Sequence, residues 1–408
     1  MMNRMTMPTT RPGRSSSSRG LARRDVMLSG GAMLGVTALG GCATGTQRKL
    51  RASSGLILPP VRASMDRVTR ITVCTRPFRA DGPRLDVERI GEKTVVHNYG
   101  HGGSGWSLSW GSGTVAVQKA LSTGANRIAV IGCGALGLTS ATLALRAGAA
   151  VTIYAKDRPP NVRSSFATGL FTPDSRIALD GRDTPQFHAL WDEMCRTSFQ
   201  TYQNYLGLPG EPVEWIDLYH VSDPNAPRPS GPDSGIRFAE MQRDGIGDWL
   251  PDRAELSGDA NPFPDRHVTR NANMMFNITE YGHLLMSDFL QAGGRIETRE
   301  FHTPADFAGL PEKVLINCTG YGARALFNDQ SVIPVRGQLA RLIPQPEVTY
   351  GLTHDYVSLV PRRDGLVVQV YGADEGQGYN DDTTNPDRAE AERGVAAIAS
   401  LFSGSGSV

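Results

Sequence analysis

A six-residue segment with glycine at its first, third and sixth positions offers the clearest chemistry in this chain of 408 residues. The glycines are Gly132, Gly134 and Gly137, in the segment GCGALG. In this pattern the first glycine permits a tight turn and the second lets the backbone approach a pyrophosphate, while the third lets a helix pack closely on a strand. The N–H groups at the start of that helix then face the anion. The segment therefore predicts a dinucleotide site.

The flanking residues are typical of the β–α–β unit that such a loop needs. Residues 128–131 are all apolar, as in a parallel strand buried on both faces. Residues 138–146 favour a helix that Gly148 can end, and residues 151–154 predict the second strand. Asp157 follows, where an acid commonly binds the ribose hydroxyls, although a solvated loop acid fits this position nearly as well. The loop alone does not separate FAD from NAD.

Composition excludes several classes of function. The chain has 42 basic and 41 acidic residues, a net charge of +1, which argues against nucleic acid as the main partner. There is no paired C-x-x-C, so no metal site is predicted. Apart from the N-terminal leader, nothing resembles a membrane span. Four cysteines follow the leader, and their spacing suggests no disulfide framework: Cys74, Cys133, Cys195 and Cys318.

Residues 1–42 are predicted to be an export leader. Arg23 and Arg24 precede a mild apolar run, residues 26–41, which is interrupted by glycine and shorter than the about 20 residues that span a membrane. Adjacent arginines before such a run resemble a twin-arginine signal. Twin-arginine export carries folded cargo, which suits a protein that must load a cofactor before export.

The end of the leader, residues 39–42 (LGGC), resembles a bacterial lipobox. It predicts a lipid anchor on Cys42 and an exported, periplasmic or cell-surface location; an ordinary secretory leader with an incidental cysteine is the alternative. Residues 43–66 have the composition of a tether. The folded protein is expected to begin at Arg67.

A longer signature follows, in residues 74–79 (CTRPFR), 95–105 (VVHNYGHGGSG) and 111–113 (GSG). It resembles the signature of the D-amino acid oxidase family, which includes D-aspartate oxidases. The resemblance continues in the flavin-contacting loop at residues 164–171, in VLINCTG at residues 314–320 and in PVRGQ at residues 334–338. It covers nearly all of residues 67–400.

The order of these motifs differs from that of the family. Relatives begin with the glycine loop and end with the signature, whereas here the signature comes first. The chain therefore resembles a circular permutation, with residues 123–126 as the new joint and residues 403–407 as the new end. Such rearrangement is tolerated because domain termini are commonly close together and exposed.

The resemblance implies an α/β fold with a Rossmann-like FAD-binding domain and a second, mixed-sheet α+β substrate domain. The FAD-binding core would comprise residues 127–172 and 278–330. The substrate domain would comprise residues 173–277 and 331–402. Residues 67–122 would be the permuted C-terminal segment of the family, which carries the substrate arginine and the flavin-edge signature.

In this family FAD takes hydride from the α-carbon of a D-amino acid, and the imine hydrolyses to a 2-oxo acid and ammonia. O₂ then reoxidises the flavin and yields hydrogen peroxide. The implied partners are thus a D-amino acid and O₂, and no catalytic acid or nucleophile is required. The sequence decides neither the preferred D-amino acid nor whether two copies form a homodimer.

By the same resemblance Arg76 binds the substrate carboxylate, a task that suits the planar guanidinium fork. Arg79 and Arg84 are the alternatives. Relatives carry a tyrosine where this chain has Ser358. Because residues two apart on a strand share a face, Tyr356 is expected to supply the missing hydroxyl.

Most of the residues that are expected to contact FAD have small side chains, and all of them lie in or next to the flavin and nucleotide motifs. Ser107 replaces a threonine that the family places near the flavin O2 edge, and His97 and His101 are expected to be structural or flavin-adjacent. The expected cofactor residues are Gly132, Gly134, Gly137, Asp157, Ser164, Ser165, Gly169, Leu170, Gly102, Gly103, Ser104, Gly105 and Ser107.

Two other classes of function remain open at this point. A nicotinamide-dependent dehydrogenase would keep the glycine loop but would have no use for the HNYGHGG signature. A non-catalytic surface lipoprotein could retain the flavin fold as a binding module. The yellow colour of bound oxidised flavin tests the first, and peroxide release with D-amino acids tests the second.

Overall fold

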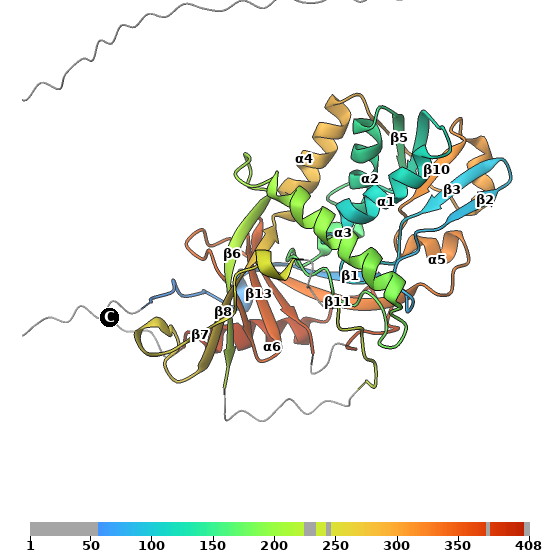
Figure 1. The fold of residues 1–408 in the computed structure, drawn as a ribbon. Helices are drawn as coiled ribbons and strands as arrows, with labels where there is room; N and C mark the ends of the chain where they lie inside the picture. The colour runs from blue at the N-terminus through green and yellow to red at the C-terminus, as the bar shows by residue number, and fades with distance from the viewer. Residues whose placement is uncertain (1–55, 224–233, 242–245, 373–375, 404–408) are drawn as a thin grey trace, which may run out of the picture. The chain divides into compact units, whose positions relative to one another are not determined.

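The computed structural model describes residues 56–223, 234–241, 246–372 and 376–403, drawn in colour in Figure 1. The leader, the lipobox and the first part of the predicted tether lie outside the described residues. The described chain contains two sheets. The first has eight strands, in the order β1 (Val68–Phe78), β11 (Ile333–Leu342), β14 (Gly365–Val370), β13 (Val357–Arg362), β12 (Gly351–His354), β6 (Val213–Ser222), β8 (His267–Phe276) and β7 (Ala254–Leu256).

The second sheet has six strands, and most of them are parallel. Their order is β2 (Val87–Ile90), β3 (Lys93–His97), β10 (Val314–Asn317), β4 (Arg127–Ile131), β5 (Ala150–Ala155) and β9 (Arg295–Thr298). Only β2 pairs antiparallel with its neighbour. β3 and β10 are buried along their whole length, as expected of parallel strands covered on both faces. The predicted α/β fold with a second, mixed sheet is confirmed.

The helices divide between the two sheets. They are α1 (Ser109–Leu121), α2 (Ala135–Arg146), α3 (Pro185–Gln203), α4 (Ile278–Gln291), α5 (Gly322–Leu326) and α6 (Arg388–Ser400). In Figure 1 α1, α2 and α4 lie over the six-stranded sheet, where α2 contacts both other helices and α3 packs against α1. α6 packs on β14, β11 and β13 of the eight-stranded sheet. In the described part of the chain, none of these helices is long and apolar enough to cross a membrane.

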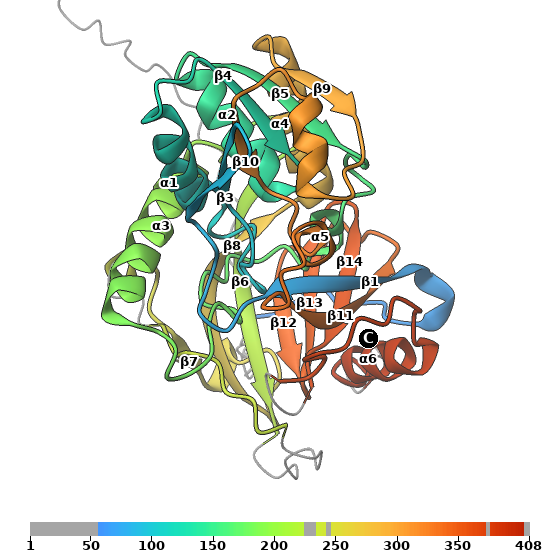
Figure 2. The same cartoon turned by 90° about the vertical axis from the view of Figure 1, so that its right-hand side faces the viewer.

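The early part of the chain contributes to both sheets. β1 pairs antiparallel with β11, from Val68 opposite Leu342 to Phe78 opposite Ile333. β3 lies parallel to β10, and Figure 2 shows β1, in blue, beside the orange strands from the end of the chain. Segments that are far apart in sequence therefore pair at one edge of the eight-stranded sheet and in the interior of the six-stranded sheet.

The last residues of the predicted tether belong to the folded part. Val61 is 4% exposed within the core on the outer side of the eight-stranded sheet. The Arg62 N–H donates to Gln345 Oε1 at 2.8 Å, and the Tyr350 hydroxyl donates to the Pro59 carbonyl at 2.5 Å. The folded part of the chain therefore begins before Arg67. Apolar side chains in residues 56–66 pack on one face of the eight-stranded sheet, a contact that the sequence pattern does not indicate.

Candidate active site

A cleft of about 960 Å³ lies beyond the carboxyl ends of the parallel strands. Open α/β sheets bind ligands at this edge. The cleft is lined by the loop after β4, the end of β5 and the residues that follow β10, and on its other side by β1, β13 and β14. Both sheets thus contribute to a single cavity, whose size suits a cofactor together with a small substrate.

The glycine loop runs along the cleft wall, and its geometry explains its glycines. Gly132 has φ = 109°, a value that other residues rarely adopt, and a Cβ there would lie 2.6 Å from the Cys318 carbonyl oxygen. A Cβ on Gly137 would overlap the Gly132 carbonyl. The helix therefore packs directly against the strand end, as the sequence predicts.

The start of α2 presents its N–H groups to the cleft. Ala135 and Leu136 line the cavity, and the Ala135 N–H donates to Ser164 Oγ at 3.1 Å. The first N–H groups of a helix have no partner within the helix and favour an anion. The structure thus brings Ser164 to the place where the glycine motif predicts a pyrophosphate. Asp157 lines the cleft beyond β5, exposed and beside Lys156.

The HNYGHGG signature forms a second wall of the cleft. Gly102 has φ = 54°, and a Cβ there would overlap the Arg176 carbonyl. The Gly103 N–H and the Ser104 hydroxyl both donate to the Ser175 carbonyl, at 3.0 and 2.9 Å. The backbone of this loop is therefore held against residues 175–176 and exposed to the cavity.

The predicted cofactor residues fall into two groups. Those that line the cleft are Gly132, Gly134, Asp157, Ser164, Gly169, Leu170, Gly102, Gly103, Gly105 and Ser107. The others, Gly137, Ser104 and Ser165, lie behind the lining and support it. Ser107 has a further task, because its hydroxyl accepts the Thr172 N–H at 2.8 Å and so joins the signature to the loop after Leu170.

The two signature histidines differ sharply in their surroundings. His97 Nε2 lies 3.0 Å from Glu88 Oε2 and its Nδ1 lies 3.1 Å from Asn317 Nδ2, which ties β3 to β10. His101 lines the cleft and is 1% exposed, yet neither ring nitrogen has a hydrogen-bond partner among the described residues. Burial lowers the pKa of His101 to about 3. Buried polar atoms are rarely left unpaired, so these nitrogens point to a ligand in the cleft.

Arg76 is a cation without a carboxylate partner in the described part of the chain. Its Nη1 donates to the Arg336 carbonyl at 3.1 Å, and no ion pair with Arg76 is formed there. Burial lowers its pKa. A Cβ on Gly337 would overlap the guanidinium, so the glycine of the PVRGQ motif makes room for Arg76. An uncompensated buried charge is costly, and an anion in the cleft would offset that cost.

The alternative arginines are engaged elsewhere. Arg79 Nε donates to Ser331 Oγ at 2.9 Å. Arg84 forms ion pairs with Asp86 and Glu88, at 2.8 and 2.9 Å. Neither residue lines the cleft. Of the three arginines that sequence offers as carboxylate ligands, the structure brings only Arg76 to the cavity.

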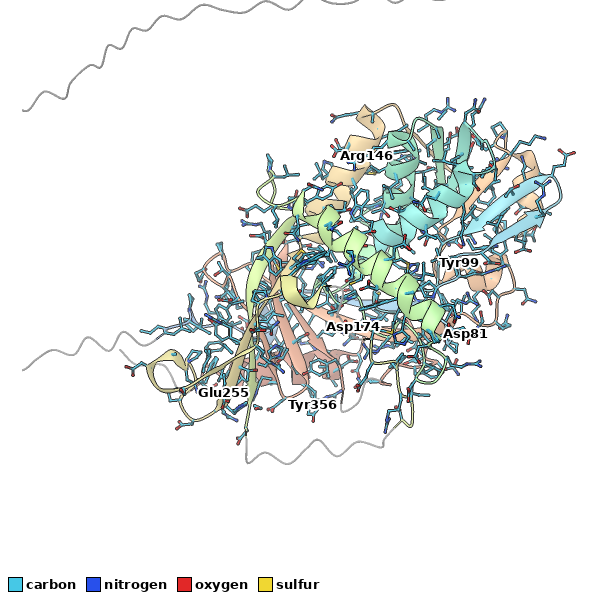
Figure 3. All side chains as sticks on the ribbon, in the orientation of Figure 1. Asp81, Tyr99, Arg146, Asp174, Glu255 and Tyr356 are labelled. Carbon is cyan, nitrogen blue, oxygen red and sulfur yellow. The ribbon has the colours of Figure 1, made fainter. Side chains whose placement is uncertain are left out.

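The expected position of Tyr356 is wrong. The alternation rule fails because β13 begins at Val357, and Tyr356 lies in the preceding turn with φ = 62°. Figure 3 shows Tyr356 at the end of the eight-stranded sheet, on the side away from α2, and it does not line the cleft. Ser358 does line it, together with Tyr371, whose ring centroid lies 6.0 Å from that of Tyr356.

Sequence reasoning missed Arg176, Gln369 and Tyr371, all of which line the cleft. Gln369 lies opposite Ser358 across the β13–β14 hairpin. The two central residues of this hairpin are Arg363 and Asp364, because Arg362 pairs with Gly365. An Asp-Gly dipeptide favours a tight turn at its own two residues, so counting from Asp364-Gly365 would have placed Tyr371 opposite Ser358. No pattern in the sequence singles out Arg176. Burial, with Tyr356 and Asp355 nearby, raises the pKa of Tyr371, so its hydroxyl stays protonated at neutral pH.

Comparison with known proteins decides the family. The model of the FAD dependent oxidoreductase family matches residues 127–408, more than half of the chain. The chain belongs to this family. Membership makes FAD the cofactor of this oxidoreductase, and the nicotinamide-dependent alternative is not supported.

Curated relatives of this FAD-dependent oxidoreductase include D-amino-acid oxidases of several organisms. A D-amino-acid oxidase of Dictyostelium discoideum is 27% identical over 277 residues, 67% of this chain and 73% of the relative. A D-amino-acid oxidase of Rubrobacter xylanophilus is 28% identical over 281 residues, 65% of this chain and 74% of the relative. Among solved structures, glycine oxidase from Bacillus cereus is 16% identical with a TM-score of 0.41, covering 60% of this chain and 70% of that one.

The residues of the cleft fit FAD. The glycine loop and the α2 N–H groups would hold the pyrophosphate, and Asp157, which lines the cleft, would be the residue to bind the ribose. The signature loop, with the unpaired nitrogens of His101 close by, would face the flavin. FAD when bound supplies a two-electron acceptor, whereas the protein supplies position and charge. No cluster of side chains among the described residues could hold a metal ion.

Proposed function

We propose that this FAD-dependent oxidoreductase oxidises D-amino acids with O₂. One D-amino acid, one O₂ and one water give one 2-oxo acid, one ammonium ion and one hydrogen peroxide. The Cα–H bond and one N–H bond of the amino group break, and the Cα–N bond becomes the C=N bond of an imine. The two electrons released reduce O₂ to peroxide. Water then hydrolyses the imine, so that oxygen replaces nitrogen at the α-carbon. The names of the curated relatives support the amino acid substrate and its D configuration.

The observation that carries the proposal is the buried guanidinium of Arg76 inside the cleft, which has no carboxylate partner among the described residues. Arginine can hold both oxygens of a carboxylate at once. The same cleft is lined by Ser358, Gln369 and Tyr371. Their hydroxyl and amide groups can hydrogen-bond the rest of a polar substrate. The arrangement suits a small carboxylate held by its charge, with the α-carbon directed into the cavity.

His101 contributes no charge to the cavity. Because burial lowers its pKa to about 3, its ring is neutral at physiological pH. It therefore adds no charge that would compete with Arg76 for the substrate carboxylate. Its ring nitrogens, which have no partner among the described residues, are available to hydrogen-bond a bound ligand rather than to transfer a proton.

A peroxide assay tests the proposal directly. The purified protein, loaded with FAD and yellow, is given a panel of D-amino acids and their L enantiomers. We expect peroxide and a 2-oxo acid in equal amounts from one or more D-amino acids and far less from the L enantiomers. If none of the panel yields peroxide, the protein is not an oxidase of D-amino acids, and a non-catalytic binding role becomes the better account.

We also propose that the chain is a circular permutation of the family's usual order. β1 and β3 both come from residues 67–122, the segment that relatives carry at their C-terminal end. β1 pairs with β11 and β3 pairs with β10, so this segment is part of both sheets, which supports the proposal. A rearranged protein that starts at Arg127 and carries residues 56–123 after Leu401, joined by a flexible linker, should still bind FAD. A soluble rearranged protein that cannot bind FAD would contradict the idea.

The proposed cellular location rests on residues outside the described part of the chain. We propose export through the Arg23-Arg24 signal and a lipid on Cys42. Mass spectrometry of the mature N-terminus should find a lipidated Cys42, and replacement of both arginines by lysine should leave the precursor inside the cell. An unmodified cysteine within an uncleaved leader would exclude the lipid anchor.

A further inference from the structure

A row of hydrogen bonds runs from the surface to the cleft at the end of β10. It begins at Glu88 on β2 and passes through His97 on β3 and Asn317 on β10. It ends at Thr319, which lines the cleft. The side chains of His97 and Asn317 are fully buried, so this row connects the surface to the cavity through the interior of the six-stranded sheet.

The Thr319 end of the row fixes the orientation of the Asn317 amide. The Thr319 N–H and the Thr319 hydroxyl lie 3.2 and 2.8 Å from Asn317 Oδ1. A backbone N–H can only donate, so the amide atom that faces it must be the oxygen. The amide nitrogen of Asn317 therefore faces His97, at 3.1 Å from Nδ1.

This orientation fixes the tautomer of His97 in turn. An amide NH₂ group only donates, so Nδ1 of the ring must accept and carries no hydrogen. The ring hydrogen is then on Nε2, which donates it to Glu88 Oε2 at 3.0 Å. Burial and the nearby charge of Arg84 lower the pKa of His97, so the ring is neutral at physiological pH and Nδ1 stays an acceptor.

Two aromatic side chains hold the His97 ring in this orientation. The ring makes edge contacts with Tyr99 and Phe327, at centroid distances of 5.5 and 5.0 Å. These contacts oppose a rotation that would turn Nδ1 away from Asn317.

The consequence for the cleft lies at Thr319. Asn317 takes both donors of this residue, so neither its N–H nor its hydroxyl hydrogen is left for a ligand. The hydroxyl oxygen keeps lone pairs that can accept a hydrogen bond. A ligand group that bonds to this hydroxyl must therefore be a donor. FAD has such donors in its sugar and ribityl hydroxyls and in the N–H of its ring system, whereas its phosphates are acceptors.

We propose that His97 is a positioning residue for FAD. Through Asn317 it holds Thr319 as a hydrogen-bond acceptor, and Thr319 accepts a hydrogen bond from a hydroxyl or N–H group of the cofactor. His97 itself does not line the cleft, so it acts through its neighbours. The inference concerns the cofactor of the family and does not depend on the amino acid substrate.

Release of flavin from the FAD-loaded protein tests the cleft end of the row. Dilution of the holoprotein, with free FAD measured by its fluorescence, gives the dissociation constant. Thr319→Val removes the accepting hydroxyl and should weaken FAD binding about three- to tenfold. Thr319→Ser keeps the hydroxyl and should stay within about twofold of the parent. A Thr319→Val variant that holds FAD as tightly as the parent would overturn the proposal.

Two substitutions separate the two nitrogens of His97. His97→Asn can place an amide oxygen near the position of Nδ1, where it accepts from Asn317. His97→Gln can place its amide near the position of Nε2 and leaves the Asn317 NH₂ group without an acceptor. Because a buried donor then loses its partner, His97→Gln should weaken FAD binding about 5- to 150-fold, and His97→Asn should recover most of that loss. Equal losses in the two variants would contradict the proposed contact.

The double variant distinguishes positioning from general support of the sheet. If His97 acts through Thr319, Thr319→Val should cost less than about twofold in the His97→Gln background, because coupled sites are not additive. An unchanged three- to tenfold cost there would mean that His97 acts independently of Thr319, and the proposal would fall.

His267→Gln is the matched control. His267 Nε2 also faces a glutamate, at 3.2 Å from Glu255 Oε1, but its side chain is 47% exposed and lies outside the cleft. This variant should hold FAD as the parent does. A loss of FAD as large as that in His97→Gln would show that the effect does not come from the buried row, which would also refute the proposal.

Discussion

Replacement of Arg76 by alanine should be the most damaging single change to substrate oxidation. Arginine has five N–H donors, and the Arg336 carbonyl takes one of them at 3.1 Å. The rest can serve a substrate carboxylate. Loss of one partner from a desolvated charge pair costs about 2–5 kcal/mol. At 1.4 kcal/mol per tenfold, kcat/KM for the best D-amino acid should fall roughly 30- to 4,000-fold.

The same substitution should affect the cofactor and the fold differently. Arg76 is not assigned to FAD, so flavin released from the denatured variant should equal that from the parent. In the absence of substrate, R76M should unfold at a higher temperature than the parent. It removes a cation that burial disfavours, a change worth about 1 kcal/mol or more.

Steady-state peroxide assays and thermal scans check both effects, with R79A as the control. Arg79 belongs to the same arginine-rich motif but donates to Ser331 outside the cleft, so R79A should stay within about twofold of the parent. Parent-like kcat/KM in R76A, or a larger loss in R79A than in R76A, would refute the assignment of the carboxylate site.

Three further predictions address the rest of the cleft. Tyr371→Phe should lower kcat/KM about two- to tenfold, because one hydrogen bond contributes about 0.5–1.5 kcal/mol, whereas Tyr356→Phe should match the parent; the reverse order would return the hydroxyl to Tyr356. Gly132→Ala should cost about 1–3 kcal/mol of stability through its φ of 109° and should weaken FAD retention, as measured by thermal unfolding and by released flavin. For His101 the folded pKa of about 3 lies below the ordinary value of 6.5. The unfolded chain thus takes up the proton first, and stability present above pH 6.5 should be lost as the pH falls towards 3, by up to about 1.4 kcal/mol per pH unit. His101→Asn should flatten that slope in chemical unfolding of the FAD-free protein, and an unchanged slope would show that other groups cause it.

The parts of this protein that depend on neighbours along the chain could be predicted from the sequence. The turn at Gly132, the helix after it and the strand at residues 150–155 follow from backbone sterics and from the period of apolar residues, which act over a few positions. These local constraints indicated the α/β fold and the nucleotide edge of the cleft. Arg76 was indicated in a different way, by the resemblance of its motif to the D-amino acid oxidase signature.

Tertiary structure alone decided which polar side chains meet in the cavity. Tyr356 and Tyr371 lie next to the same pair of strands, β13 and β14. Tyr371 lines the cleft, whereas Tyr356, in a turn with positive φ, does not. Arg176 lines the cleft, and its neighbour Ser175 is hydrogen-bonded to a loop more than 70 residues earlier. Such contacts depend on the packing of distant segments, and a sequence pattern with a period of two or four residues carries no information about them.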